Sequence, residues 1–155
     1  MVQNWQKKAP PHATCTSPRD ALDYLLPHLV NEDGSVYRRE RIAVLALSHS
    51  GKVLGSVVLH EGSASRTIVC PKEILSWALC LTEMSSGLIL AHNHPSGDPT
   101  PSAEDRALTR KLGQMLHDFG CPLRDHIIVG GHGQWTSLAE RGLLPAWGAR
   151  TSDFI

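Results

Sequence analysis

Apolar and polar positions alternate along this chain in blocks that predict both strands and amphipathic helices. Short apolar runs between turn residues indicate strands at 41–47, 53–60, 66–70, 88–91, 125–129 and 134–137. Apolar residues at helical spacing indicate helices from Ser17 to near Asn31, from Pro71 to Met84, and from Ser102 to Gly120. This order predicts an α/β fold, a mixed sheet of about six strands flanked by helices on both faces.

The length of the chain favours a single domain. With 155 residues and 16.9 kDa it can bury one sizeable hydrophobic core. Residues 1–16 carry two lysines and two prolines without periodicity, so we assign them to a flexible N-terminal arm. We assign 17–145 to the domain and 146–155, which show no clear pattern, to a C-terminal tail.

Composition narrows the classes of partner. Lysine plus arginine equals aspartate plus glutamate, so the formal charge is zero and gives no electrostatic support for nucleic-acid binding. The sequence has no apolar run of membrane-spanning length and no secretory core at its start, so we expect a soluble cytoplasmic protein without membrane contact. Four scattered cysteines favour reduced core thiols over disulfides or metal ligands.

Two histidines emerge where the apolar run Leu88–Ala91 ends. Side chains alternate along a strand, so His92 and His94 point to the same side, with Asn93 opposite, and can share one metal ion. The following stretch, 95–101, is rich in proline and glycine and turns the chain back towards the strand.

A helix then begins with Ser102 as N-cap and Asp105 at its third position. A capping box explains this pair without further function. However, Asp105 precedes by one turn the apolar stripe of the helix, which runs from Leu108 to Phe119, so it should face inward. Two histidines and one aspartate would leave a fourth position open on a tetrahedral ion, which is typical of catalytic zinc rather than structural zinc. Water at that position would have a pKa of about 7.

The spacing His-x-His, seven residues, Ser, two residues, Asp resembles the JAMM motif of the MPN-domain metalloproteases. The longer pattern, with Pro101 and the later stretch from Asp125 through His126 to Gly130, resembles the RadC branch over roughly Arg38 to Leu144. The resemblance implies a three-layer MPN fold, also described as JAB or cytidine-deaminase-like. It also implies a link by name to DNA repair.

The resemblance further implies roles for individual residues. His92, His94 and Asp105 match the ligands of Zn²⁺, and Ser102 matches the serine that positions the reacting water or the developing oxyanion. Glu40, at the head of an apolar strand, best matches the general base. The implied function is a zinc-dependent hydrolase in which activated water attacks a peptide or isopeptide amide of a protein substrate.

Other functions are weighed against this one. A zinc deaminase would need His-x-Glu and Pro-Cys-x-x-Cys, and a serine hydrolase would need Gly-x-Ser-x-Gly; both patterns are missing. The remaining alternative is a non-catalytic DNA-repair-associated or protein-interaction domain, although only a short arm and one helix precede the region of resemblance here. Exposed strand edges would allow a homodimer. His126 is either a hydrogen-bonded core residue or a residue that acts behind the ligands or on substrate.

Overall fold

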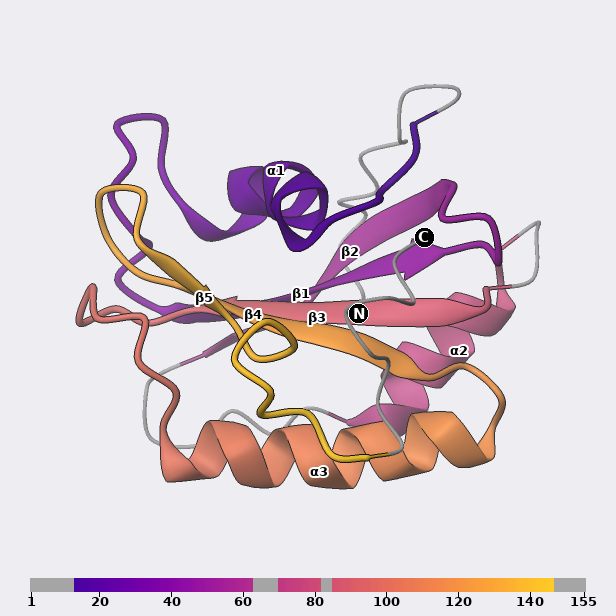
Figure 1. The fold of residues 1–155 in the computed structure, drawn as a ribbon. Helices are drawn as coiled ribbons and strands as arrows, with labels where there is room; N and C mark the ends of the chain where they lie inside the picture. Colours follow the sequence, from indigo (N-terminus) through magenta and orange to yellow (C-terminus); the bar gives the residue numbers. More distant parts are fainter. Residues whose placement is uncertain (1–12, 63–69, 82–84, 147–155) are drawn as a thin grey trace.

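The structure, a computed structural model, describes residues 13–62, 70–81 and 85–146. Its centre is a mixed sheet of five strands in the order β2-β1-β3-β4-β5 (Figure 1). The strands are β1 (Glu40–Leu47), β2 (Val53–Gly62), β3 (Gly87–Asn93), β4 (Leu123–Val129) and β5 (Trp135–Ser137). β3 and β4 are parallel, whereas every other neighbouring pair is antiparallel. The predicted mixed sheet is therefore confirmed.

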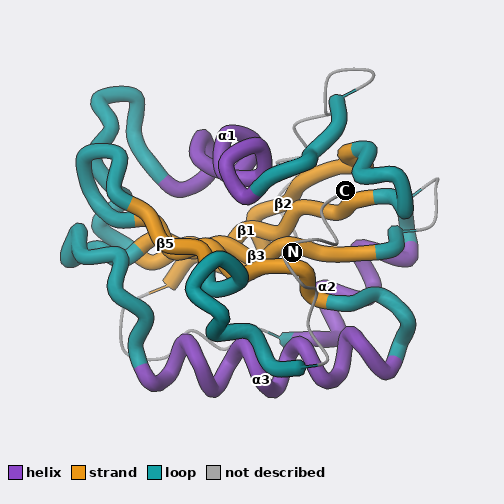
Figure 2. The backbone as a smooth tube through the Cα atoms, viewed as in Figure 1, coloured by secondary structure: helices purple, strands orange, loops and turns teal. Residues whose placement is uncertain are grey.

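Helices cover both faces of the sheet. The helix α1 (Pro18–Leu29) lies on one face, and α2 (Pro71–Leu79) and α3 (Ala103–Asp118) lie on the other (Figures 1 and 2). The protein is thus a three-layer α/β domain, and the expected fold class is confirmed. In the described part of the chain, no helix is both long and apolar enough to cross a membrane.

Strand alternation divides the apolar side chains into two cores. Leu45 of β1 and Ile89 of β3 pack in the core that α1 covers, while their neighbours Val44 and Leu90 pack in the core that α3 covers. His92 continues the second series, two residues after Leu90, so its side chain is directed to the α3 side. The site histidines therefore lie between the sheet and α3.

The connection from β3 to α3 brings the end of the strand next to the start of the helix. β3 ends at Asn93, the loop 94–101 reverses the chain, and α3 begins after the N-cap Ser102. α3 is the crossover between the parallel strands β3 and β4, which requires a connection of this length. Ligands in open α/β sheets commonly bind outside the carboxyl ends of such strands.

Some expected segments fall outside the described residues. Residues 1–12 of the predicted arm, 147–155 of the predicted tail and 66–69 of the predicted third strand are among them. Cys70, the last residue of that strand prediction, is the N-cap of α2. The end of the arm packs on the domain: the Cys15 N–H donates to the Gly51 carbonyl, and the Val53 N–H donates to the Ala13 carbonyl.

Several details of the sequence prediction are wrong. Phe119, placed on the inward stripe of α3, is 69% exposed because the helix ends there and Phe119 is its C-cap. His28 lies within the predicted first helix and is buried, with its Nε2 3.0 Å from the Ser56 hydroxyl of β2. Cys80, expected in the core, is exposed where α2 ends, although its thiol is free as predicted.

Candidate metal centre

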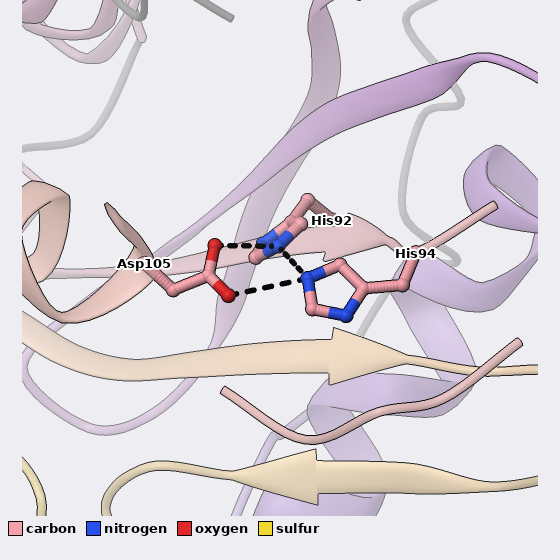
Figure 3. Close-up of side chains that lie close together, drawn as sticks. All are labelled: His92, His94 and Asp105. Atoms are coloured by element: carbon pink, nitrogen blue, oxygen red, sulfur yellow. Dashed lines mark hydrogen bonds and ion pairs between the residues drawn. The ribbon is translucent and has the colours of Figure 1, made fainter. Parts of the chain in front are cut away.

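Three predicted ligands meet at the carboxyl end of β3. His92 is the penultimate residue of β3, His94 follows the strand, and Asp105 lies in the first turn of α3 (Figure 3). The Nε2 atom of His92 lies 3.0 Å from Asp105 Oδ1, and that of His94 lies 3.2 Å from Oδ2. The two Nε2 atoms are 3.0 Å apart. One potential ligand atom from each residue thus lies within 4.8 Å of the others, close enough to hold one ion.

The outer nitrogen of each imidazole ring has a partner of its own. His94 Nδ1 lies 2.8 Å from the Asp98 carbonyl, which can only accept, so this nitrogen carries a proton. His92 Nδ1 lies 2.7 Å from Nε2 of His126 on β4. Second partners of this kind orient metal-binding histidines. Both rings are therefore held with Nε2 towards Asp105.

Asp105 is held by the capping box that the sequence predicts. The Ser102 hydroxyl accepts from the Asp105 N–H at 3.1 Å, and Asp105 Oδ2 accepts from the Ser102 N–H at 2.8 Å. Burial alone would raise the pKa of the Asp105 carboxyl, but the hydrogen bonds of His92, His94 and the Ser102 N–H hold it well below its usual range. Asp105 is therefore a carboxylate at neutral pH, as a metal ligand must be.

The charge of that carboxylate also acts on His94. Its hydrogen bond to Asp105 raises the pKa of the His94 imidazole above the ordinary value, against the opposing effect of burial. A histidine nitrogen that binds a metal must be unprotonated, so a metal that binds at His94 Nε2 has to displace the proton that this nitrogen shares with Asp105.

Glu40, the predicted general base, lies beside the same cluster. It is the first residue of β1, two residues before Ile42, which pairs with His92 in the sheet. Its Oε1 lies 3.8 Å from His92 Nε2, and its side chain is 19% exposed. The sheet register thus brings a partly solvated carboxylate from a distant part of the sequence to the predicted ligands.

Asn93 holds the backbone on both sides of Glu40. Its amide Nδ2 donates to the carbonyls of Tyr37 and Arg39, each at 3.1 Å, and its Oδ1 accepts from the Arg41 N–H at 2.8 Å. The side chain is fully buried on the face opposite to His92, as strand alternation predicts. Strand alternation predicts the side on which Asn93 lies but not these three hydrogen bonds.

Ser102 lies at the edge of the cluster through the capping box. Because its oxygen accepts from the Asp105 N–H, its own hydroxyl proton is directed elsewhere and can be donated. The structure thus brings together all five predicted site residues: His92, His94, Asp105, Glu40 and Ser102.

Two further residues lie behind the ligands. His126 is completely buried, and its Nδ1 lies 2.7 Å from the Thr109 hydroxyl of α3. That hydroxyl donates to the Asp105 carbonyl at 2.7 Å. Burial holds the pKa of His126 well below its ordinary value. His126 is thus a hydrogen-bonded core residue, the first of its two predicted descriptions, and it also contacts His92. Thr109 was missed, and its position one helical turn after Asp105 is the signal that could have revealed it.

The three-layer fold and the His-x-His, Asp cluster define a JAB-type domain. Residues 15–143 match the family described as the RadC-like JAB domain, and this chain belongs to the RadC family.

Curated relatives support the same assignment. A UPF0758 protein of Pelobacter propionicus is 42% identical over 129 residues, which cover 83% of this chain and 53% of the relative. A UPF0758 protein of Coprothermobacter proteolyticus is 40% identical over 143 residues, or 90% of this chain and 57% of the relative. A third, from Symbiobacterium thermophilum, is 38% identical over 83% of this chain and 51% of its own length. The chain thus spans about half the length of these relatives.

Proposed function

We propose that this chain is a zinc-dependent hydrolase of the JAMM type that cleaves a peptide or isopeptide amide in a protein substrate. The observation that carries the proposal is the meeting of His92, His94 and Asp105, with one potential ligand atom from each within 4.8 Å of the others. Glu40 Oε1, a proton acceptor, lies 3.8 Å from His92 Nε2.

The donor set suits zinc. Two imidazole nitrogens and one carboxylate are ordinary zinc ligands, and three protein ligands leave a coordination position open for water or substrate. Each of the two rings has its Nδ1 atom engaged by another group, which leaves Nε2 for the ion. When bound, zinc would supply Lewis acidity, which lowers the pKa of water and polarises a carbonyl.

The residues around the cluster can carry the proton transfers of amide hydrolysis. Glu40 would accept a proton from the attacking water and pass it to the leaving amine. The Ser102 hydroxyl would donate to the oxygen that becomes negative in the tetrahedral intermediate. Asn93, through the backbone on both sides of Glu40, would hold this base in place. Asp105 would remain ionised throughout, because its pKa is held below its usual range.

Metal content is the first test. Elemental analysis of the purified protein should find about one zinc per chain, and His94→Ala should lose it. His117→Ala is a matched control, because His117 is an exposed histidine in the last turn of α3, away from the cluster. Iron in place of zinc would redirect the proposal, since two histidines and one carboxylate also hold non-haem iron. No metal and no uptake on titration would refute it.

Hydrolysis is the second test, with a peptide library and a reporter joined through a lysine isopeptide bond. Glu40→Gln keeps the shape of the side chain but removes the proton acceptor. It should retain zinc and lower the rate of hydrolysis by about 10²–10⁴-fold. Full activity in this variant would refute the role of Glu40.

The alternative function is a non-catalytic DNA-repair-associated or protein-interaction domain. The balanced charge of the chain gives nucleic-acid binding no support. Salt-sensitive binding of DNA by a protein that takes up no metal would favour this alternative. A cytoplasmic location and a homodimer through exposed strand edges stay predictions.

A further inference from the structure

We propose that Thr109 and His126 are positioning residues that keep a proton on Nδ1 of His92, so that its Nε2 presents a lone pair to the metal. The inference rests on the proposed metal site, and it concerns two residues that the JAMM spacing does not include. It follows from a chain of hydrogen bonds in which each donor is determined by the one before.

The chain begins at the backbone of α3. The Thr109 hydroxyl lies 2.7 Å from the carbonyl oxygen of Asp105. A carbonyl can only accept, so the hydroxyl proton lies in this bond. The same Thr109 oxygen is 2.7 Å from His126 Nδ1, and having no second proton it must accept there. His126 therefore carries its proton on Nδ1.

The second step passes through the ring of His126. This ring is fully buried, and a charge on it would have lost all its hydration. In the neutral ring with a proton on Nδ1, the other nitrogen, Nε2, is an acceptor. Nε2 lies 2.7 Å from His92 Nδ1, so the proton in that bond belongs to His92. With its proton on Nδ1, His92 has Nε2 as the nitrogen that can bind the metal; a second proton on Nε2, which donates to Asp105 Oδ1 3.0 Å away in the metal-free protein, is the one that an ion would displace.

This arrangement connects two ligands from different elements. His92 comes from β3 and Asp105 from α3, and their side chains meet with Nε2 and Oδ1 3.0 Å apart. Behind the site, the backbone of Asp105 connects back to His92 through Thr109 and His126. These hydrogen bonds therefore join α3 to the sheet behind the ligands, in addition to the direct contact between His92 and Asp105. The other ligand, His94, obtains the same protonation on Nδ1 more simply, from the carbonyl of Asp98.

Removing the hydroxyl of Thr109 should allow the proton of His92 to move from Nδ1 to Nε2. In Thr109→Val, which has nearly the same shape, His126 Nδ1 loses its acceptor. His126 can then move its proton to Nε2 and donate it to His92, which would force the His92 proton onto the nitrogen that faces the metal. Thr109→Ser keeps the hydroxyl and should keep the network.

The experiment titrates the metal-free protein with Zn²⁺ against a chromophoric chelator. Thr109→Val should bind zinc about 10–100-fold more weakly than wild type, while Thr109→Ser binds close to wild type. Melting curves of the metal-free variants control for folding. Wild-type zinc affinity in Thr109→Val, or an equal loss in both variants, would overturn the positioning role.

Nuclear magnetic resonance tests the same inference without any variant. Long-range correlations between ring protons and ¹⁵N in the metal-free wild type at pH 8 should find His92 and His126 protonated on Nδ1. A His92 ring with a bare Nδ1 would overturn the inference. The expected protonation in a protein that binds no zinc would support the network but refute the proposed hydrolase. Zinc binding that is unaffected in Thr109→Val would refute the network and leave the hydrolase standing.

Discussion

Replacing Asn93 with alanine should destabilise the domain and displace Glu40 while leaving the metal ligands in place. Asn93 is fully buried and makes three hydrogen bonds to the backbone around Glu40, at 2.8, 3.1 and 3.1 Å. Such bonds contribute about 0.5–1.5 kcal/mol each. The free energy of unfolding should therefore fall by about 2–4 kcal/mol, which corresponds to a drop in Tm on the order of 10 °C.

Asn31→Ala is the matched control, because it removes the same amide group from an exposed position. The Asn31 amide donates to the carbonyl and hydroxyl of Ser35, at 3.3 and 3.0 Å. Exposed substitutions of this kind usually change stability by no more than about 0.5 kcal/mol. Urea denaturation of the metal-free proteins compares the two variants directly. If Asn93→Ala loses no more stability than Asn31→Ala, the three buried bonds make no net contribution and the reasoning fails.

The functional consequence of Asn93→Ala separates its role from that of the histidines. His92 and His94 keep their outer partners in this variant, so zinc affinity should stay within a few-fold of wild type. The rate of hydrolysis should fall, since the backbone on both sides of Glu40 loses its hydrogen bonds to Asn93. A variant that loses zinc affinity as severely as activity would show that Asn93 supports the ligands instead.

Three other results are expected. Gly130→Ala should cost about 1–3 kcal/mol and weaken zinc binding, because a Cβ there would lie 2.3 Å from a carbonyl oxygen in the loop after β3. Gly131→Ala is the control, because a Cβ at Gly131 would lie 3.8 Å from its nearest neighbour. If both variants lose the same stability in urea denaturation, the close approach at Gly130 is not the cause. Burial raises the pKa of the Cys15 thiol to about 12, whereas Cys80 is exposed. Mass spectrometry after iodoacetamide treatment at pH 8 should find Cys80 modified and Cys15 unmodified until the protein unfolds. The neighbouring carboxylate raises the pKa of His94 in the metal-free protein. The stabilisation from this pair is therefore complete below the unfolded pKa of about 6.5 and is lost as pH rises through the folded value. Between pH 6 and pH 9, the Tm of metal-free wild type should fall more than that of His94→Ala, and parallel curves would refute the effect.

Local rules account for the part of the site that lies between β3 and α3. Alternation along a strand places His92 and His94 on one side and Asn93 on the other, whatever the rest of the fold. The capping box of Ser102 and Asp105 forms within a single helical turn. These features depend on neighbours a few residues away, which is why the sequence alone predicts them.

Local rules also failed where the end of an element decides exposure. Phe119 fits the apolar stripe of α3 by spacing, yet the helix ends at that residue and leaves it in solvent. His28 has the polarity of a surface residue but meets Ser56 across the α1 face of the sheet. A spacing pattern cannot reveal either outcome, because both depend on which surface covers the end of the helix or the histidine.

The sequence by itself thus determined the α/β class, the common side of His92 and His94, and the helix cap that carries Asp105. The tertiary structure alone decided how Glu40 reaches His92, since this depends on the register between β1 and β3. It also decided the hydrogen bond from the Arg41 N–H to Asn93 Oδ1, which joins two residues 52 positions apart. The contact of His126 with His92, 34 residues apart, has the same origin. Partners so distant along the chain meet only after the sheet has paired, and no local periodicity encodes that pairing.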